Sequence, residues 1–154
     1  MARSISSNRY VELNELLEFV RPRHNAVLCT TRSTGALQLS PVTMGLDDSS
    51  RIVIASYPER AKAINLRRDP RATVCVLSDD FGGEWVQIDG TAEVLDVPAA
   101  VEPLVEYFRN IAGEHSDWGE YRQAMLDQGK VLIRITVESW GPIAKGGFPA
   151  RLAD

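Results

Sequence analysis

The feature that most constrains this chain is a series of six short apolar runs rich in strand-forming residues. The runs fall at 25–33, 36–46, 51–57, 71–78, 84–96 and 130–143. Short links join most successive runs, and the link at Thr34-Gly35 is typical of a tight hairpin turn. Short links favour antiparallel pairing, and about six strands with a long last one suffice to close a small barrel. The sequence therefore predicts an antiparallel β-barrel.

Four segments with helical spacing accompany these runs, at 10–20, 59–68, 98–113 and 117–128. Pro58 suits the first turn of the second helix, and Pro70 disfavours helix at the residue before it, so that helix should end near Asp69. Ser116 or Asp117 is expected to cap the last helix. We therefore predict one α+β domain over 1–154, a barrel with peripheral helices, with 1–8 and 145–154 as flexible ends.

Composition narrows the classes of function. A net charge of −4 and a pI of about 5.2 argue against general nucleic-acid binding, which usually shows a basic footprint. No apolar run approaches the roughly 20 residues of a membrane span, and the first residues lack the apolar block of a secretory signal. The expected partner is therefore a small molecule, with no nucleic acid and no membrane span, and the expected location is the cytoplasm.

No motif for catalysis or metal binding is present in the sequence. His24 and His115 lie outside any nucleophile motif and are expected to have structural or solvated roles. Cys29 and Cys75 are isolated within strand runs and are interpreted as buried, reduced thiols. HExxH, Walker and GxGxxG patterns are all missing. We therefore predict no metal site and no catalytic residue, so an enzyme of this sequence would borrow its reactive group from a cofactor.

A dense basic segment lies between the third and fourth runs. From Ser56 to Ala72 it carries two acids and five cations, which are Arg60, Lys62, Arg67, Arg68 and Arg71. Arg60 and Lys62 fall at the start of the predicted helix, where free backbone N–H groups favour a phosphate or carboxylate. A solvated helix face explains the same charges equally well. The residues alone leave both interpretations open.

Longer stretches carry a resemblance to a known family. The stretches "GALQLSPV", "RIVIASYPERAKAINLRRDPRATV" and "GTAEV" resemble the pyridoxamine-5'-phosphate-oxidase-like superfamily of split β-barrel flavoproteins. With "FRNIAGEHSDWGEYRQAM", the chain is more closely similar to the F420-dependent flavin/deazaflavin oxidoreductases of group B, an actinobacterial subgroup. The resemblance runs from about Asn25 to about Trp140. It implies a homodimer with cofactor sites at the interface and hydride transfer from reduced coenzyme F420 to a small organic acceptor. An FMN-dependent oxidase or reductase and a non-catalytic flavin or deazaflavin carrier stay open as alternatives.

The resemblance also assigns site residues. It places Arg60 and Lys62, with Ala61 between them, on the cofactor phosphate, and Ala55 and Ser56 along the ribityl chain and ring. The segment bordering the deazaflavin ring is Gln38, Leu39, Ser40 and Pro41. The partner subunit is expected to contribute Gly83, Glu84 and Trp85. Arg67, Arg68 and Arg71 would suit the oligoglutamate tail of coenzyme F420, which FMN lacks.

Overall fold

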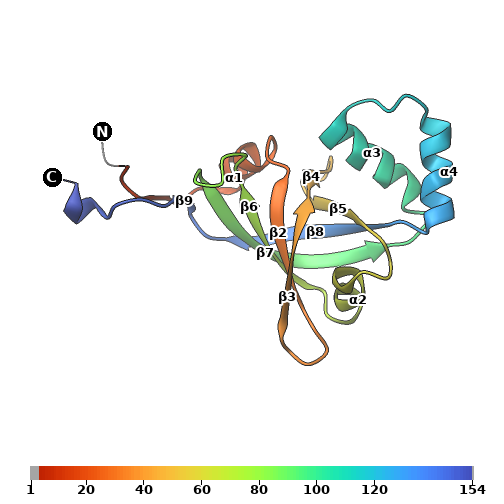
Figure 1. Cartoon of the computed structure of the whole chain (residues 1–154), viewed down its shortest axis with the longest axis horizontal. Helices are drawn as coiled ribbons and strands as arrows, with labels where there is room; N and C mark the ends of the chain where they lie inside the picture. Colours follow the sequence, from red (N-terminus) through yellow and green to blue (C-terminus); the bar gives the residue numbers. More distant parts are fainter. Residues whose placement is uncertain (1–3, 154) are drawn as a thin grey trace.

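The strands form one curled, antiparallel sheet, whose order is β3-β2-β6-β7-β8-β5-β4 in the computed structural model, which describes residues 4–153. Its longer members correspond to the six predicted runs: β2 (Asn25–Thr31), β3 (Leu37–Thr43), β5 (Ile52–Ser56), β6 (Arg71–Leu77), β7 (Trp85–Leu95) and β8 (Val131–Trp140). β3 also comes close to β5 without pairing with it (Figure 1). The prediction of an α+β split barrel is confirmed.

Two of the predicted runs are interrupted. The second run continues into β4 (Gly45–Leu46) after Met44, whose side chain is fully buried and whose backbone N–H donates to His24 O at 2.8 Å. The last run continues into β9 (Ile143–Lys145) after Pro142, which has no N–H for a ladder.

The two ends of the chain pair with each other. β9 pairs with β1 (Ser7–Arg9), the Phe148 N–H donates to Ser4 O at 2.8 Å, and η1 (Ala150–Leu152) follows. The flexibility expected of 1–8 and 145–154 stays a prediction, and residues 1–3 and 154 lie outside the described part.

The four predicted helices are present with later starting points. They are α1 (Leu13–Val20), α2 (Ala61–Arg68), α3 (Val101–Ala112) and α4 (Trp118–Gln128). The prediction that Pro58 lies in the first turn of α2 is wrong, because Tyr57–Arg60 closes a separate turn in which Arg60 N–H donates to Tyr57 O at 3.1 Å. The predicted end is confirmed, since Asp69, before Pro70, is extended with φ −135° and ψ 107°.

The core fills the barrel because alternate residues of each strand point inward. On β2 and β6 these are Ala26, Leu28, Val74 and Val76, all 4% exposed or less. A bulge between Asp89 and Gly90 helps β7 to bend, and a Cβ on Gly90 would lie 2.1 Å from Thr136 O. The backbones of β7 and β8 therefore approach too closely at this point for any side chain.

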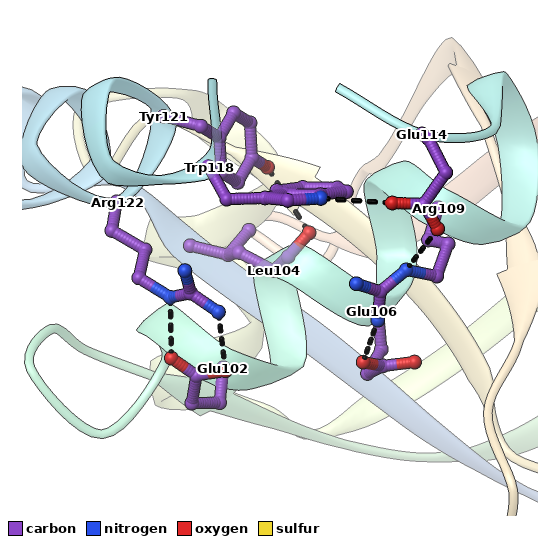
Figure 2. A network of polar contacts seen from close by, with 8 residues as sticks. All are labelled: Glu102, Leu104, Glu106, Arg109, Glu114, Trp118, Tyr121 and Arg122. Carbon is purple, nitrogen blue, oxygen red and sulfur yellow. Dashed lines mark hydrogen bonds and ion pairs between the residues drawn. The ribbon is translucent and has the colours of Figure 1, made fainter. Parts of the chain in front are cut away.

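α3 and α4 form a hairpin over a second, smaller apolar cluster that includes Val53, Leu104 and Leu132. Figure 2 shows how polar contacts join the two helices: Arg122 donates to Glu102 at 2.7 Å, and the Tyr121 hydroxyl donates to Leu104 O at 3.0 Å. None of the helices in residues 4–153 has the length and apolar character needed to span a membrane.

The turn between α3 and α4 explains the role of His115. Asp117 caps α4 as predicted, accepting the Glu120 N–H at 3.0 Å, while the Asp117 N–H donates to His115 Nδ1 at 2.9 Å. The imidazole ring lies against Phe108, with ring centroids 5.2 Å apart. His24, at the start of β2, has Nδ1 2.7 Å from Met44 O. Both histidines therefore serve the local structure.

Candidate functional site

The corner between β5 and α2 places Arg60 and Lys62 at a helix N-terminus. β5 ends at Ser56, the turn follows, and Arg60 is the extended N-cap residue with φ −72° and ψ 145°. Lys62 is the second residue of the helix, and no acidic residue lies in its first turn. The first N–H groups of a helix have no partner within it and carry a partial positive charge. This corner therefore combines two cationic side chains with the backbone donors of α2.

Neither cation is neutralised by the chain itself. Within residues 4–153, Arg60 and Lys62 form no ion pair with a carboxylate. Burial lowers the pKa of the Lys62 ammonium, and the nearby charge of Arg60 lowers it further. Both effects disfavour the charged lysine in the free protein, and the attraction of a bound anion would oppose them. Charge that is concentrated and unpaired is the property expected of an anion site.

The other three cations of the basic segment already have partners. Arg67 donates to Asp96 through both terminal nitrogens at 3.0 and 2.5 Å, and Arg71 pairs with Asp69 at 2.6 Å. Hydrogen bonds from Arg71 lower the pKa of Asp69 to about 2. Arg68 donates to Thr31 O at 2.5 Å. The arginines predicted as contacts for an oligoglutamate tail are therefore engaged within the chain, unlike Arg60 and Lys62.

A chain of buried hydrogen bonds ties α2 to the sheet. Asn65 donates to Thr30 Oγ1 at 3.0 Å, Thr30 donates to Gln38 Oε1 at 3.2 Å, and Arg68 donates to Asn65 Oδ1 at 3.2 Å. Thr30 is 1% exposed and Asn65 is 6% exposed. Sequence reasoning missed both residues, although a polar residue among apolar neighbours was a signal. The network fixes the predicted phosphate helix against Gln38, a predicted ring contact.

The four residues predicted to border the ring divide between the two faces of β3. Gln38 and Ser40 share the interior face, where Ser40 lies opposite Leu28 in register. Leu39 and Pro41 point to the outer face. One chain therefore brings Gln38 and Ser40 toward the α2 corner, because α2 contacts β3 and β3 lies close to β5 with Ala55 and Ser56.

Ser40 carries a polar atom that the protein leaves unsatisfied. Its Oγ is buried and makes no hydrogen bond within the described part of the chain. Buried hydroxyls nearly always have a partner, so the exception needs an explanation. A ligand ring that offers hydrogen-bonding atoms beside β3 would give this hydroxyl a partner, as an anionic group would pair with Arg60 and Lys62. The residues present therefore suit a ligand that carries both an anionic group and a hydrogen-bonding ring.

The outer face of β3 exposes apolar side chains. Leu37 and Leu39 are 63% and 60% exposed, and Pro41 is also exposed beside Val27. Cys29 and Cys75 lie on the same face of the sheet as free thiols, and because both are only half-buried, the prediction of buried thiols is wrong. The error has a simple cause: strand residues alternate between faces, and neighbours of the cysteines fill the core. Burial raises the pKa of both thiols, which favours their protonated form.

Gly83, Glu84 and Trp85 lie far from this corner within one chain. Gly83 N–H donates to Asp80 O at 2.9 Å in the loop before β7, and Trp85 pairs with Leu77 at the end of β6. α2 leads into the other end of β6, and a strand of seven residues spans about 20 Å. Figure 1 shows the same separation between α2 and the loop beside α1. A single chain therefore does not bring these three residues to the α2 corner.

A cavity lies away from this corner, between α3 and the β4–β5 side of the sheet. Its volume is about 320 Å³, and its lining includes Asp47, Arg51, Tyr107 and Arg134. None of the predicted site residues lines it. At the α2 corner, Tyr57 and Arg60 are exposed and Lys62 is half-buried.

The curled antiparallel sheet with its peripheral helices defines the class of split β-barrel proteins. Residues 13–144 match the pyridoxamine 5'-phosphate oxidase family. The chain belongs to this family, which confirms the resemblance to the superfamily noted from the sequence.

Solved structures agree on the fold. A conserved hypothetical protein of Mycobacterium tuberculosis superposes with a TM-score of 0.71 at 22% identity, covering 89% of this chain and 87% of the other. An F420 reductase superposes at 0.62 and 18% identity, with 85% and 98% covered. A FAD-binding protein of Mesorhizobium loti superposes at 0.64 and 16% identity, with 93% and 100% covered. At such identities the likeness establishes the fold alone.

Proposed function

We propose that this chain is a coenzyme F420-dependent oxidoreductase of the group B flavin/deazaflavin type, which transfers a hydride to a small organic acceptor. The observation that carries the proposal is the pair of unneutralised cations, Arg60 and Lys62, at the N-terminus of α2. An arginine fork and a lysine ammonium are the groups that bind a phosphate, and the helix end adds backbone donors. In this proposal the whole chain acts as one cofactor-binding domain.

Each residue of the corner has a defined task in this proposal. Arg60 and Lys62 hold the phosphate beside Ala61, while Ala55 and Ser56 line the ribityl chain. Ser40 and Gln38 hydrogen-bond and orient the ring from the interior face of β3. When bound, the reduced deazaflavin supplies the hydride chemistry. The protein then needs only to bind, orient and exclude water, which suits a chain with no catalytic motif.

The proposal includes a homodimer. The exposed apolar side chains of Leu37 and Leu39 favour burial against a second copy of the same face. In such a dimer, Leu39 and Pro41 lie at the interface, and Gly83, Glu84 and Trp85 reach the site of the other chain. The distance between α2 and Gly83 within one chain supports this arrangement.

The choice of coenzyme F420 over a flavin rests on sequence resemblance and on the F420 reductase among structures of the same fold. The alternative is an FMN-dependent oxidase or reductase of the same family, or a non-catalytic carrier. The FAD-binding protein of the same fold favours flavin binding.

Turnover distinguishes these functions. Purified protein is titrated with coenzyme F420, FMN and FAD by fluorescence, and reduced coenzyme F420 is then mixed with a panel of quinones and enones. We expect tightest binding of coenzyme F420 and acceptor-dependent oxidation that needs the protein. Tighter binding of FMN contradicts the proposal, and binding of coenzyme F420 without turnover on any acceptor supports the carrier.

A further inference from the structure

A further cation, Lys130, reaches the α2 corner from the far end of the sequence. α4 ends at Gln128, Gly129 takes the left-handed conformation with φ 59°, and Lys130 N–H donates to Met125 O at 3.1 Å. The next residue, Val131, pairs with Ser56 at the end of β5. The helix end and the strand register together place Lys130 beside Tyr57, the residue after Ser56.

Tyr57 links Lys130 to the phosphate corner. The Lys130 ammonium lies 3.8 Å from the centroid of the Tyr57 ring, and the Arg60 guanidinium carbon lies 5.8 Å from the same centroid. Both distances fall in the range of cation–π contacts, so one ring holds two cations. Within residues 4–153, Lys130 forms no ion pair with a carboxylate. The corner therefore gathers Arg60, Lys62 and Lys130, and although Glu59 lies in the same turn, no carboxylate of residues 4–153 forms an ion pair with any of the three.

Three unpaired cations exceed what one phosphate group needs. An arginine fork occupies two phosphate oxygens and one lysine suffices for the remaining charge. The other basic residues of the segment, Arg67, Arg68 and Arg71, are engaged within the chain. Lys130 is thus a cation at this corner that has no protein partner of opposite charge in the described part of the chain.

We propose that Lys130 binds a second anionic group of the cofactor, beyond the phosphate held by Arg60 and Lys62. The inference rests on the proposed function and deepens it, because it makes Lys130 a determinant of cofactor choice. The second group is a carboxylate of an oligoglutamate tail or the second phosphate of a dinucleotide. FMN carries neither.

The test compares ligands that differ in this second group. Wild type, Lys130→Gln, Lys130→Arg and Lys145→Gln are titrated by fluorescence with FMN, FAD and coenzyme F420, and thermal melting checks that each variant folds. Lys145 is an exposed lysine on β9 and serves as the matched control. We expect Lys130→Gln to weaken coenzyme F420 binding about tenfold and FMN binding less than about threefold. Lys130→Arg and Lys145→Gln should stay within about threefold of wild type.

The outcomes separate this inference from the proposed function. If wild type binds FAD but not coenzyme F420, the proposed function fails, while a loss by Lys130→Gln that is selective for FAD over FMN still supports the role of Lys130. Equal losses for all ligands, or no loss for any, overturn the inference even if coenzyme F420 binds. Wild type that binds none of the three ligands overturns both.

Discussion

Replacing Ser40 with alanine should stabilise the free protein and weaken cofactor binding. The Ser40 hydroxyl is buried without a partner among the described protein atoms. A buried polar group left unsatisfied costs about 1–3 kcal/mol. Alanine removes only the oxygen atom, and the small void it leaves subtracts part of the gain. We therefore expect the free energy of unfolding of the free protein to rise by about 1 kcal/mol in Ser40→Ala.

The same change should have the opposite effect on binding. If the cofactor forms a hydrogen bond with the hydroxyl, binding to wild type removes the free-energy cost of the unsatisfied buried group. The alanine variant lacks this group and therefore gains no such contribution to binding. The free energy of binding should therefore weaken by a similar amount, and about 1 kcal/mol corresponds to a roughly fivefold higher dissociation constant. A single substitution that raises stability and lowers affinity separates a ligand contact from an ordinary packing position.

Urea unfolding of the free protein and fluorescence titration with coenzyme F420 measure the two effects. Ser139→Ala serves as the control, because Ser139 is exposed on β8 and its removal should change stability by less than about 0.5 kcal/mol. A Ser40→Ala protein that is less stable than wild type, or that binds the cofactor equally well, would refute the reasoning.

Three further perturbations test other parts of the account. Thr30→Val removes the acceptor of Asn65 and should lower the free energy of unfolding by about 1–3 kcal/mol in urea, since a buried amide loses its partner; an unchanged midpoint contradicts this role. Burial, together with Tyr107, raises the pKa of Tyr121 to about 12, so the folded state holds this proton more tightly and stability should fall between about pH 10 and 12. Tyr121→Phe should remove that alkaline loss, and its persistence would rule out Tyr121 as the source. Leu39→Glu should convert a dimer into a monomer in size-exclusion chromatography, whereas Leu126→Glu, exposed on α4, should not; equal elution of both variants with wild type argues against the proposed interface.

Local signals in the sequence predicted most of the fold correctly. Strand runs, the helix end before Pro70 and the cap at Asp117 depend on residues close together in the chain, so their physics is visible in short windows. The start of α2 was predicted wrongly, because proline is compatible both with a separate turn and with the first turn of a helix. The backbone hydrogen bond from Arg60 to Tyr57 decides for the separate turn, and the sequence alone does not reveal this bond.

The site was harder to predict because it depends on contacts between distant segments. Cys29 and Cys75 occupy the outer face because of strand register, which an apolar run alone does not reveal. The hydrogen bond from Asn65 to Thr30 joins α2 to β2, and the two residues lie 35 positions apart in the sequence. Lys130 reaches Tyr57 only because β8 pairs with β5. The density of cations in the sequence indicated the corner between β5 and α2. Contacts between distant segments determine which of those cations form ion pairs within the chain.

Binding of coenzyme F420 to wild type and Arg60→Ala tests the central claim most directly. Arg21→Ala is the matched control, because Arg21 is an exposed arginine at the end of α1. The account predicts that wild type binds coenzyme F420 more tightly than FMN. It also predicts that Arg60→Ala weakens this binding by about 1.5–3 kcal/mol while Arg21→Ala leaves it unchanged. Equal affinity of Arg60→Ala and wild type, or tighter binding of FMN by wild type, would contradict it.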